Sequence, residues 1–152
     1  MDPVLLAFLS RARSAHHRAD AFEQQHQLEA AVAELVSVTR GPAPPGSYPE
    51  AREVLADTHA RLADLRSRQG RFDEAEQEVE AGLELATGRT YFRGHLFEMR
   101  GLVHERRHRA LDADGKHAEA EAAREAALRA FERAMQIQAE VIRGALGEQE
   151  DP

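Results

Sequence analysis

Two histidines and a glutamate in the segment His104–His108 form the pattern in this sequence with the clearest potential for chemistry. On a helix, the order His-Glu-x-x-His places both imidazoles on one face, one turn apart, where they can bind Zn²⁺. Glu105 would then activate a zinc-bound water molecule for hydrolysis. A zinc site needs a third protein ligand. Asp114 lies at the position of the third ligand in the longer form of this motif, whose glycine and final histidine the sequence lacks. No strand that could hold a peptide substrate is expected nearby, so a zinc-dependent hydrolase stays an alternative to a histidine pair without metal.

The remaining polar clusters are more typical of a solvated surface than of a metal-binding or catalytic site. His16 and His17 are adjacent, so on a helix their side chains point about 100° apart and cannot bind one metal ion as a pair. The glutamates between Glu74 and Glu84 favour an exposed acidic helix face. The sequence contains no cysteine and no glycine-rich phosphate loop. We therefore expect no catalytic residue, no metal and no cofactor.

The composition limits the classes of partner. The chain of 152 residues carries a net charge of −7. Because it has no basic surplus to displace counterions, we expect neither a nucleic acid nor an anionic membrane as partner. The apolar run after Met1 lacks the basic start of a secretory signal, and no run approaches the about 20 apolar residues that span a bilayer. We expect a soluble cytoplasmic protein, and the frequent alanine and arginine favour a bacterial source.

Apolar residues recur at spacings of three and four along the chain, which predicts an all-α fold of about six helices without strands. Proline and glycine cannot continue a helix, so the segment Gly41–Ser47 predicts a stiff connector. The helices are expected from Pro3 to about Gln25, from Leu28 through Val36, from Pro49 through Leu65, from about Asp73 to Ala86, from near Thr90 to between Asp112 and Asp114, and from His117 to about Arg143.

The segment Gln69–Leu85, which reads QGRFDEAEQEVEAGLEL, has two more divergent counterparts in the chain. One is Phe22–Leu35, where Ala31 matches Ala75 after a turn. The other is divided between Phe97–His108, which contains Arg100-Gly101 and His104, and Arg124–Ile137, which contains Ala127, Phe131 and Ala134. These segments resemble the tetratricopeptide repeat, a unit of about 34 residues with two antiparallel helices.

The resemblance implies one α-solenoid domain over residues 1–147, with repeats at about 12–40, 56–89 and 94–141. Ala31 and Ala75 lie 44 positions apart, and the proline-rich connector 41–49 explains the excess over one repeat. We expect the longer third unit to have a lengthened hairpin at 109–122, with about two turns added to each helix, and residues 148–152 to form a frayed acidic tail. Gly82 replaces the alanine of the family, and close contact between helices would explain it.

In this family the first helix of each repeat lines a concave groove, so the resemblance implies a non-enzymatic scaffold or adaptor that binds a peptide or helix of another protein. The chain contains no asparagine, which disfavours the family's carboxylate clamp. Arginines in this groove could hold an acidic segment, with Met99 and Leu102 as an apolar shelf. The alternative is a mixed-charge solvated surface. The expected groove residues are Arg13, His17, Asp20, Arg61, Asp64, Arg68, His95, Met99 and Leu102, and His16, Gln24, Asp57, Glu98 and Glu105 lie at further groove positions.

Two other functions and one assembly stay open. Small acidic proteins built of three such repeats also serve as secretion-type chaperones, so the resemblance allows that function as well. The zinc hydrolase would use His104 and His108 with Glu105. Because the ends of a short solenoid are exposed, stacking into a homodimer is a further expectation.

Overall fold

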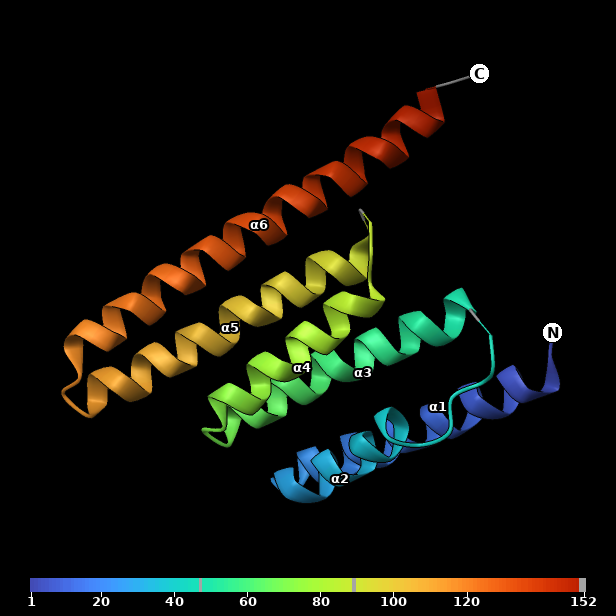
Figure 1. Cartoon of the computed structure of the whole chain (residues 1–152), viewed down its shortest axis with the longest axis horizontal. Helices are drawn as coiled ribbons and strands as arrows, with labels where there is room; N and C mark the ends of the chain where they lie inside the picture. Colours follow the sequence, from blue (N-terminus) through green and yellow to red (C-terminus); the bar gives the residue numbers. More distant parts are fainter. Residues whose placement is uncertain (47, 89, 151–152) are drawn as a thin grey trace.

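The computed structural model describes residues 1–46, 48–88 and 90–150, with only the backbone of 148–150. Over these residues the chain is all-α, with six helices and no strand (Figure 1), as the apolar spacing predicts. The helices are α1 (Pro3–Gln24), α2 (Leu28–Thr39), α3 (Pro49–Arg68), α4 (Phe72–Leu85), α5 (Tyr91–Ala113) and α6 (His117–Glu150).

The three short turns between paired helices share one hydrogen-bonding pattern. Each has a residue in the left-handed conformation, with φ of 59° at His26, 78° at Gly70 and 77° at Gly115. In each turn the next backbone N–H donates to the carbonyl five residues earlier, at 2.9 Å, as from Arg71 to Arg66. This arrangement satisfies carbonyls at the helix end that would otherwise lack a partner. The chain thus reverses in the same way after α1, α3 and α5.

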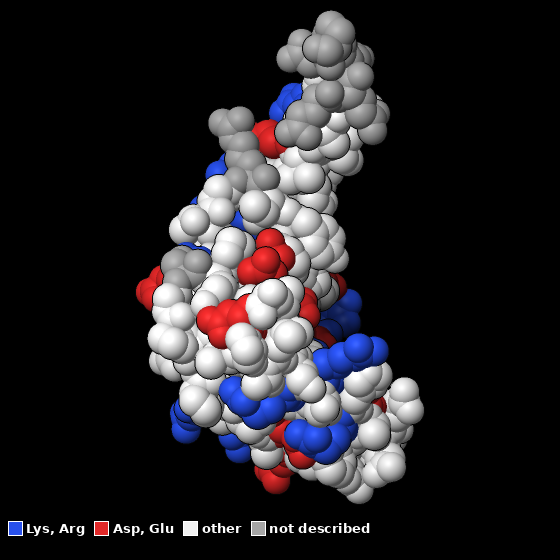
Figure 2. Space-filling model, turned by 90° about the vertical axis from the view of Figure 1, so that its right-hand side faces the viewer, with Lys and Arg blue, Asp and Glu red and all other residues white. Residues whose placement is uncertain are grey.

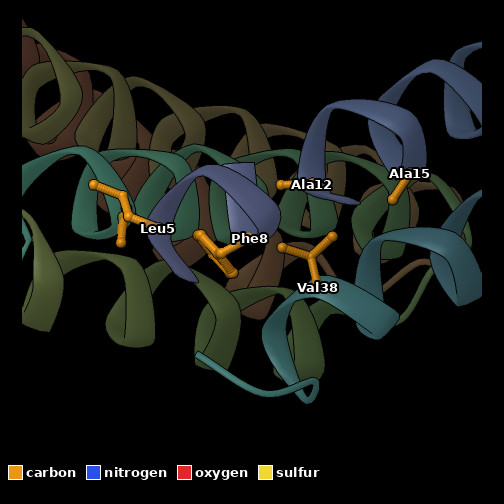
Figure 3. Packing of buried hydrophobic residues seen from close by; sticks show 6 residues of the cluster. Leu5, Phe8, Ala12, Ala15 and Val38 are labelled. Carbon is orange, nitrogen blue, oxygen red and sulfur yellow. The ribbon is translucent and has the colours of Figure 1, made fainter. Parts of the chain in front are cut away.

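Neighbouring helices pack in pairs, α1 with α2, α3 with α4 and α5 with α6, and α3 also lies against both α1 and α5. Figure 3 shows the first of these interfaces, where Phe8 of α1 and Val38 of α2 point toward one another beside Leu5 and Ala12. Between the later pairs, Ala63, Val79 and Val103 form a cluster that joins α3, α4 and α5. Small and branched side chains therefore fill the core, as a chain poor in aromatic residues requires.

Two glycines mark places where helices approach closely. A Cβ at Gly82 would lie 2.6 Å from a methyl carbon of Leu96, which confirms the close contact expected there. A Cβ at Gly101 would lie 2.6 to 2.8 Å from three ring carbons of Phe131. The loss of helix propensity at these glycines is therefore offset by closer packing of α4 and α6 against α5.

The third hairpin is longer than the others, although in a different way than expected. α5 has 23 residues, close to the 22 of α1 and the 20 of α3, whereas α6 has 34 against 12 in α2 and 14 in α4. The prediction of two added turns in each helix is thus wrong for α5. α5 lies along α3 and matches its length, while α6 has no later helix in the described chain to limit it.

The boundaries of other predicted segments differ at a few points. α6 continues through Gly144 and Gly147 to Glu150, beyond the expected end at Arg143, because two glycines weaken a helix without terminating it as proline does. Ser47 in the connector, position 89 at the end of the expected second repeat and positions 151–152 of the expected tail lie outside the described residues. Within the described chain, no helix combines the length and apolar character needed to cross a membrane.

Candidate functional site

One face of the molecule is formed by α1, α3 and α5, and charged side chains join these three helices across it. Arg61 of α3 reaches α1, where it pairs with Asp20 and, at 3.2 Å, with Glu23. Arg68 binds the same Glu23 at 2.6 Å. Burial would raise the pKa of Glu23, but the hydrogen bonds from Arg68 and Arg61 outweigh it and hold that pKa below its ordinary value. Glu23 is thus ionised and anchors both arginines to α1.

The same kind of bridge joins α5 to α3. Arg106 donates to Asp64 Oδ1 at 2.6 Å and to Ser67 Oγ at 2.7 Å. Sequence reasoning placed Asp64 on this face and missed Arg106, Ser67 and Glu23. Arg106 lies within the His104–His108 segment, where the pattern draws attention to the two histidines as metal ligands and not to the arginines between them.

The structure brings four of the expected groove residues, Asp20, Arg61, Asp64 and Arg68, onto one face. Their charges are already compensated, because each forms an ion pair within the chain. An arginine held by two carboxylates has less free charge to offer an acidic segment than an unpaired one. These residues connect the helices, and Arg13 is the expected groove arginine without an ion pair among the described residues.

His16 of α1 lies against α3 and is held in its neutral form. Arg61 Nη1 donates to His16 Nδ1 at 3.3 Å, so the opposite ring nitrogen carries the proton and donates to Thr58 Oγ1 at 2.8 Å. The Thr58 hydroxyl in turn donates to the Val54 carbonyl at 2.7 Å. Burial and the Arg61 charge lower the pKa of His16, against an opposing effect of Asp57 and Asp20.

A cleft of about 320 Å³ opens beside His16, where the three helices meet. Its walls are apolar side chains, and on its rim Arg13, Glu53 and Asp57 are exposed. None of these three forms an ion pair among the described residues, in contrast to the paired charges described above. The lining residues are Leu9, Ala12, Arg13 and His16 of α1, Glu53, Val54 and Asp57 of α3, and Phe92 of α5.

Charges of both signs border this cleft, one arginine and two carboxylates. Figure 2 views the molecule from the end at which α1, α3 and α5 begin, and charged side chains of both signs lie between one another over its lower half. A ligand of one charge sign would meet repulsion as well as attraction there. The apolar walls and the mixed rim together suit a segment with an apolar anchor and charged flanks.

Several expected groove residues lie elsewhere. Met99 is only 8% exposed and belongs to the cluster between α3, α4 and α5, and Leu102 packs against that cluster. The expected exposed shelf is therefore wrong for Met99, because the close approach of α5 to α3 buries it. His95 is partly buried and stacks on Tyr91 at 6.0 Å between ring centroids. His17 is exposed on α1 next to the buried Ala19.

The two histidines of the His104–His108 segment are engaged with different helices. His104 Nε2 lies 2.9 Å from Glu76 Oε1 on α4, and its Nδ1 is buried without a partner. His108 Nδ1 donates to the Ala120 carbonyl on α6 at 2.8 Å. Burial lowers the pKa of His104, as do the charges of Arg107, Arg100 and Arg129, while Glu76 opposes them. Glu105 pairs with Arg109 at 2.6 Å.

Asp114, the expected third zinc ligand, follows the last residue of α5. Because α5 stays helical between His104 and Ala113, Asp114 lies about 15 Å along the helix axis from His104. One metal ion cannot span that distance at ordinary ligand lengths of about 2 Å. Among the described residues, no group of three or more histidine, aspartate or glutamate side chains is placed to hold a metal ion.

Three other clefts are larger, and the two largest are less suited to a defined ligand. One of about 630 Å³ lies between α1 and α2 and is bordered by Ser10, Ser14 and Arg18, the last paired with Glu34 at 2.8 Å. The other, of about 430 Å³, lies between α4 and α6 over Phe97, with Glu76 and Glu80 opposite its arginines. The cleft beside His16 differs from both in that the charged residues on its rim form no ion pair in the described chain.

No model of a known protein family matches the chain, and no curated protein matches it either.

Proposed function

We propose that this chain is a non-enzymatic protein-interaction module of the tetratricopeptide type, which binds a peptide segment of another protein across the face of α1, α3 and α5. The cleft beside His16 carries the proposal. It has apolar walls, it lies where three helices meet, and its rim offers charges that no ion pair in the described chain compensates.

The repeated turn geometry supports the solenoid part of the proposal. Three helix pairs reverse at His26, Gly70 and Gly115 through one hydrogen-bonding pattern. The first helices of the pairs are bridged to one another by Arg61 and Arg106. A stack of such hairpins has one face lined by first helices, which is the usual ligand face of helical repeat proteins.

The dimensions of the cleft indicate what it binds. A volume of about 320 Å³ is at the lower limit for small-molecule sites and suits one large apolar side chain. Phe92, Val54 and Leu9 would contact that anchor, and Arg13 would receive a carboxylate on one side. Glu53 and Asp57 would receive a lysine or arginine on the other. We therefore propose as ligand a peptide whose aromatic or long aliphatic residue is flanked by charges of opposite sign.

A random peptide library displayed on phage tests the proposal. Selection on the immobilised full chain should enrich peptides with one large apolar residue beside charged ones, and the enriched peptide should bind with a micromolar or lower Kd. Arg13→Glu reverses a rim charge and should weaken that binding about tenfold, the effect expected of one charged contact.

Arg11→Glu is the matched control for Arg13→Glu. Arg11 is also exposed on α1, and it borders the cleft between α1 and α2 instead. The control should leave peptide binding unchanged. No enriched peptide, or equal losses in the two variants, would contradict a binding site in the cleft beside His16.

A further inference from the structure

The outer face of α6 carries a line of exposed aliphatic side chains. Leu128, Met135, Ile142 and Leu146 are between 50% and 68% exposed. The opposite face of α6 is buried against α5, through Ala127, Ala130, Ala134 and Ile137 among others. Figure 1 shows α6 at the edge of the molecule, with α5 on one side and no helix on the other. Large apolar side chains gathered on one exposed helix face indicate an interaction surface.

The spacing of these residues has the heptad pattern of a coiled coil. Leu128, Met135 and Ile142 lie seven positions apart, and Glu132, Ala139 and Leu146 follow each of them by four. Alternating spacings of four and three keep a line of side chains facing one partner helix. The line spans 18 positions, about 27 Å of helix, which is close to three heptads.

From this pattern we propose that α6 pairs antiparallel with α6 of a second copy of the chain, about a two-fold axis near Ile137. In that register Leu128 meets Leu146 of the other copy, and Met135 meets Ala139. Glu132, the one charged residue in the line, comes beside Arg143 of the other copy. Neither Glu132 nor Arg143 forms an ion pair among the described residues of a single chain.

The charges decide between the possible orientations. A parallel pair would place Glu132 against Glu132 and Arg143 against Arg143, which repel. The antiparallel pair forms two Glu132–Arg143 ion pairs by symmetry, and a polar residue at one core position of a coiled coil commonly fixes register. A two-fold pair also closes on itself, whereas packing of α6 against α1 of another copy would continue into a filament.

Sedimentation equilibrium of the full chain tests the pairing. At micromolar to submillimolar concentration the mass should be twice the 16.9 kDa of the chain. Met135→Glu buries a charge in the line and should leave a monomer, while its circular dichroism stays helical. The control Leu6→Glu changes an exposed aliphatic residue of α1, which is 52% exposed against 68% for Met135, and should stay dimeric. A monomeric wild-type chain would overturn the proposal, as would dissociation by Leu6→Glu.

Register and orientation are tested by charge exchange and by cross-linking. Glu132→Arg and Arg143→Glu should each weaken the dimer several-fold, and the double variant should restore it. Because the chain has no cysteine, Leu128→Cys mixed with Leu146→Cys should form a disulfide-linked pair under mild oxidation, and neither variant should do so alone. A disulfide between two Leu128→Cys chains would show a parallel pair and refute the register.

Discussion

At the residue scale, His16 of α1 contacts Thr58 and Arg61 of α3, and it also lines the proposed binding cleft. Its ring accepts from Arg61 at 3.3 Å and lies 2.8 Å from Thr58 Oγ1, so a second proton on Nδ1 would face a guanidinium. The pKa of His16 is lowered by burial first and by Arg61 second. The folded structure therefore contains the neutral His16 ring, and protonation of this ring lowers the free energy of unfolding.

The free energy of unfolding should accordingly fall as pH falls. In the unfolded chain His16 titrates near its ordinary pKa of 6.5, while in the folded chain it binds a proton only at lower pH. Stability is then fully present above about pH 6.5 and is lost as pH falls toward the folded pKa. Urea unfolding between pH 7.5 and pH 5 measures this slope, to which His104 adds in the same direction because its pKa is also lowered.

His16→Gln keeps a hydrogen-bonding side chain that does not titrate, so it should flatten this pH dependence. His17→Gln removes an exposed histidine next to it and should leave the slope as in the wild-type chain. A slope equally steep in His16→Gln and in the wild-type chain would show that the buried ring does not resist protonation.

At the element scale, the helices themselves could be predicted from the sequence because local signals coincide with them. Asp2 accepts from the backbone of Val4 at 2.9 Å, Pro3 opens α1, and glycines stand in two of the three turns. Position 26 shows the limit of such signals, since histidine rarely adopts a φ of 59°. The sequence nevertheless placed a turn there, because the apolar pattern restarts at Leu28.

The length of α6 and the bridge from Arg106 could not be predicted in the same way. Helix length at a chain end depends on what packs against it, and Gly144 and Gly147 only lower the local propensity. Arg106 pairs with a residue 42 positions earlier in the chain. Long-range pairs of this kind depend on the register between α3 and α5, which the apolar spacing of each helix alone leaves undetermined.

Gly101→Ala tests the close contact of α5 with α6. Because the added Cβ would lie 2.6 Å from the Phe131 ring, the ring must move. Overpacking lowers the free energy of unfolding by about 1–3 kcal/mol, and the higher helix propensity of alanine raises it by about 0.5–1 kcal/mol. A net loss of about 1 kcal/mol in the free energy of unfolding is expected from urea denaturation.

Gly144→Ala provides the comparison, since a Cβ there meets nothing within 4 Å. It should stabilise the chain slightly, by up to about 1 kcal/mol. If Gly101→Ala stabilised the chain as much as Gly144→Ala, the helices would not pack as closely as the structure shows.

At the scale of the whole molecule, the protein has two faces of different character. The face of α1, α3 and α5 is crossed by ion pairs and holds a small apolar cleft with an uncompensated rim. The outer face of α6 carries aliphatic side chains in a heptad pattern. The two proposed contacts use separate surfaces, so a dimer would present two peptide-binding faces and gain avidity for a partner with two binding segments.

Sequence reasoning found most of the charged residues on the first face and misplaced its apolar part. Asp20, Arg61 and Asp64 lie on the first helix of a helical hairpin, and the apolar periodicity of each helix predicts which of its faces is polar. The cleft beside His16 is lined by Leu9, Val54 and Phe92, which come from three different helices. Met99, expected to be exposed on this face, is buried. Which apolar residues stay exposed depends on how closely the helices approach, a property of the packed structure.

Methyl NMR of the chain, labelled at leucine, valine and isoleucine and titrated with the library-selected peptide, tests the central claim most directly. The account predicts that the resonances of Leu9 and Val54 shift on binding, while those of Leu128 and Leu146 on α6 do not. Shifts confined to α6, or a spectrum unchanged at saturating peptide, would contradict a peptide-binding cleft formed by α1, α3 and α5.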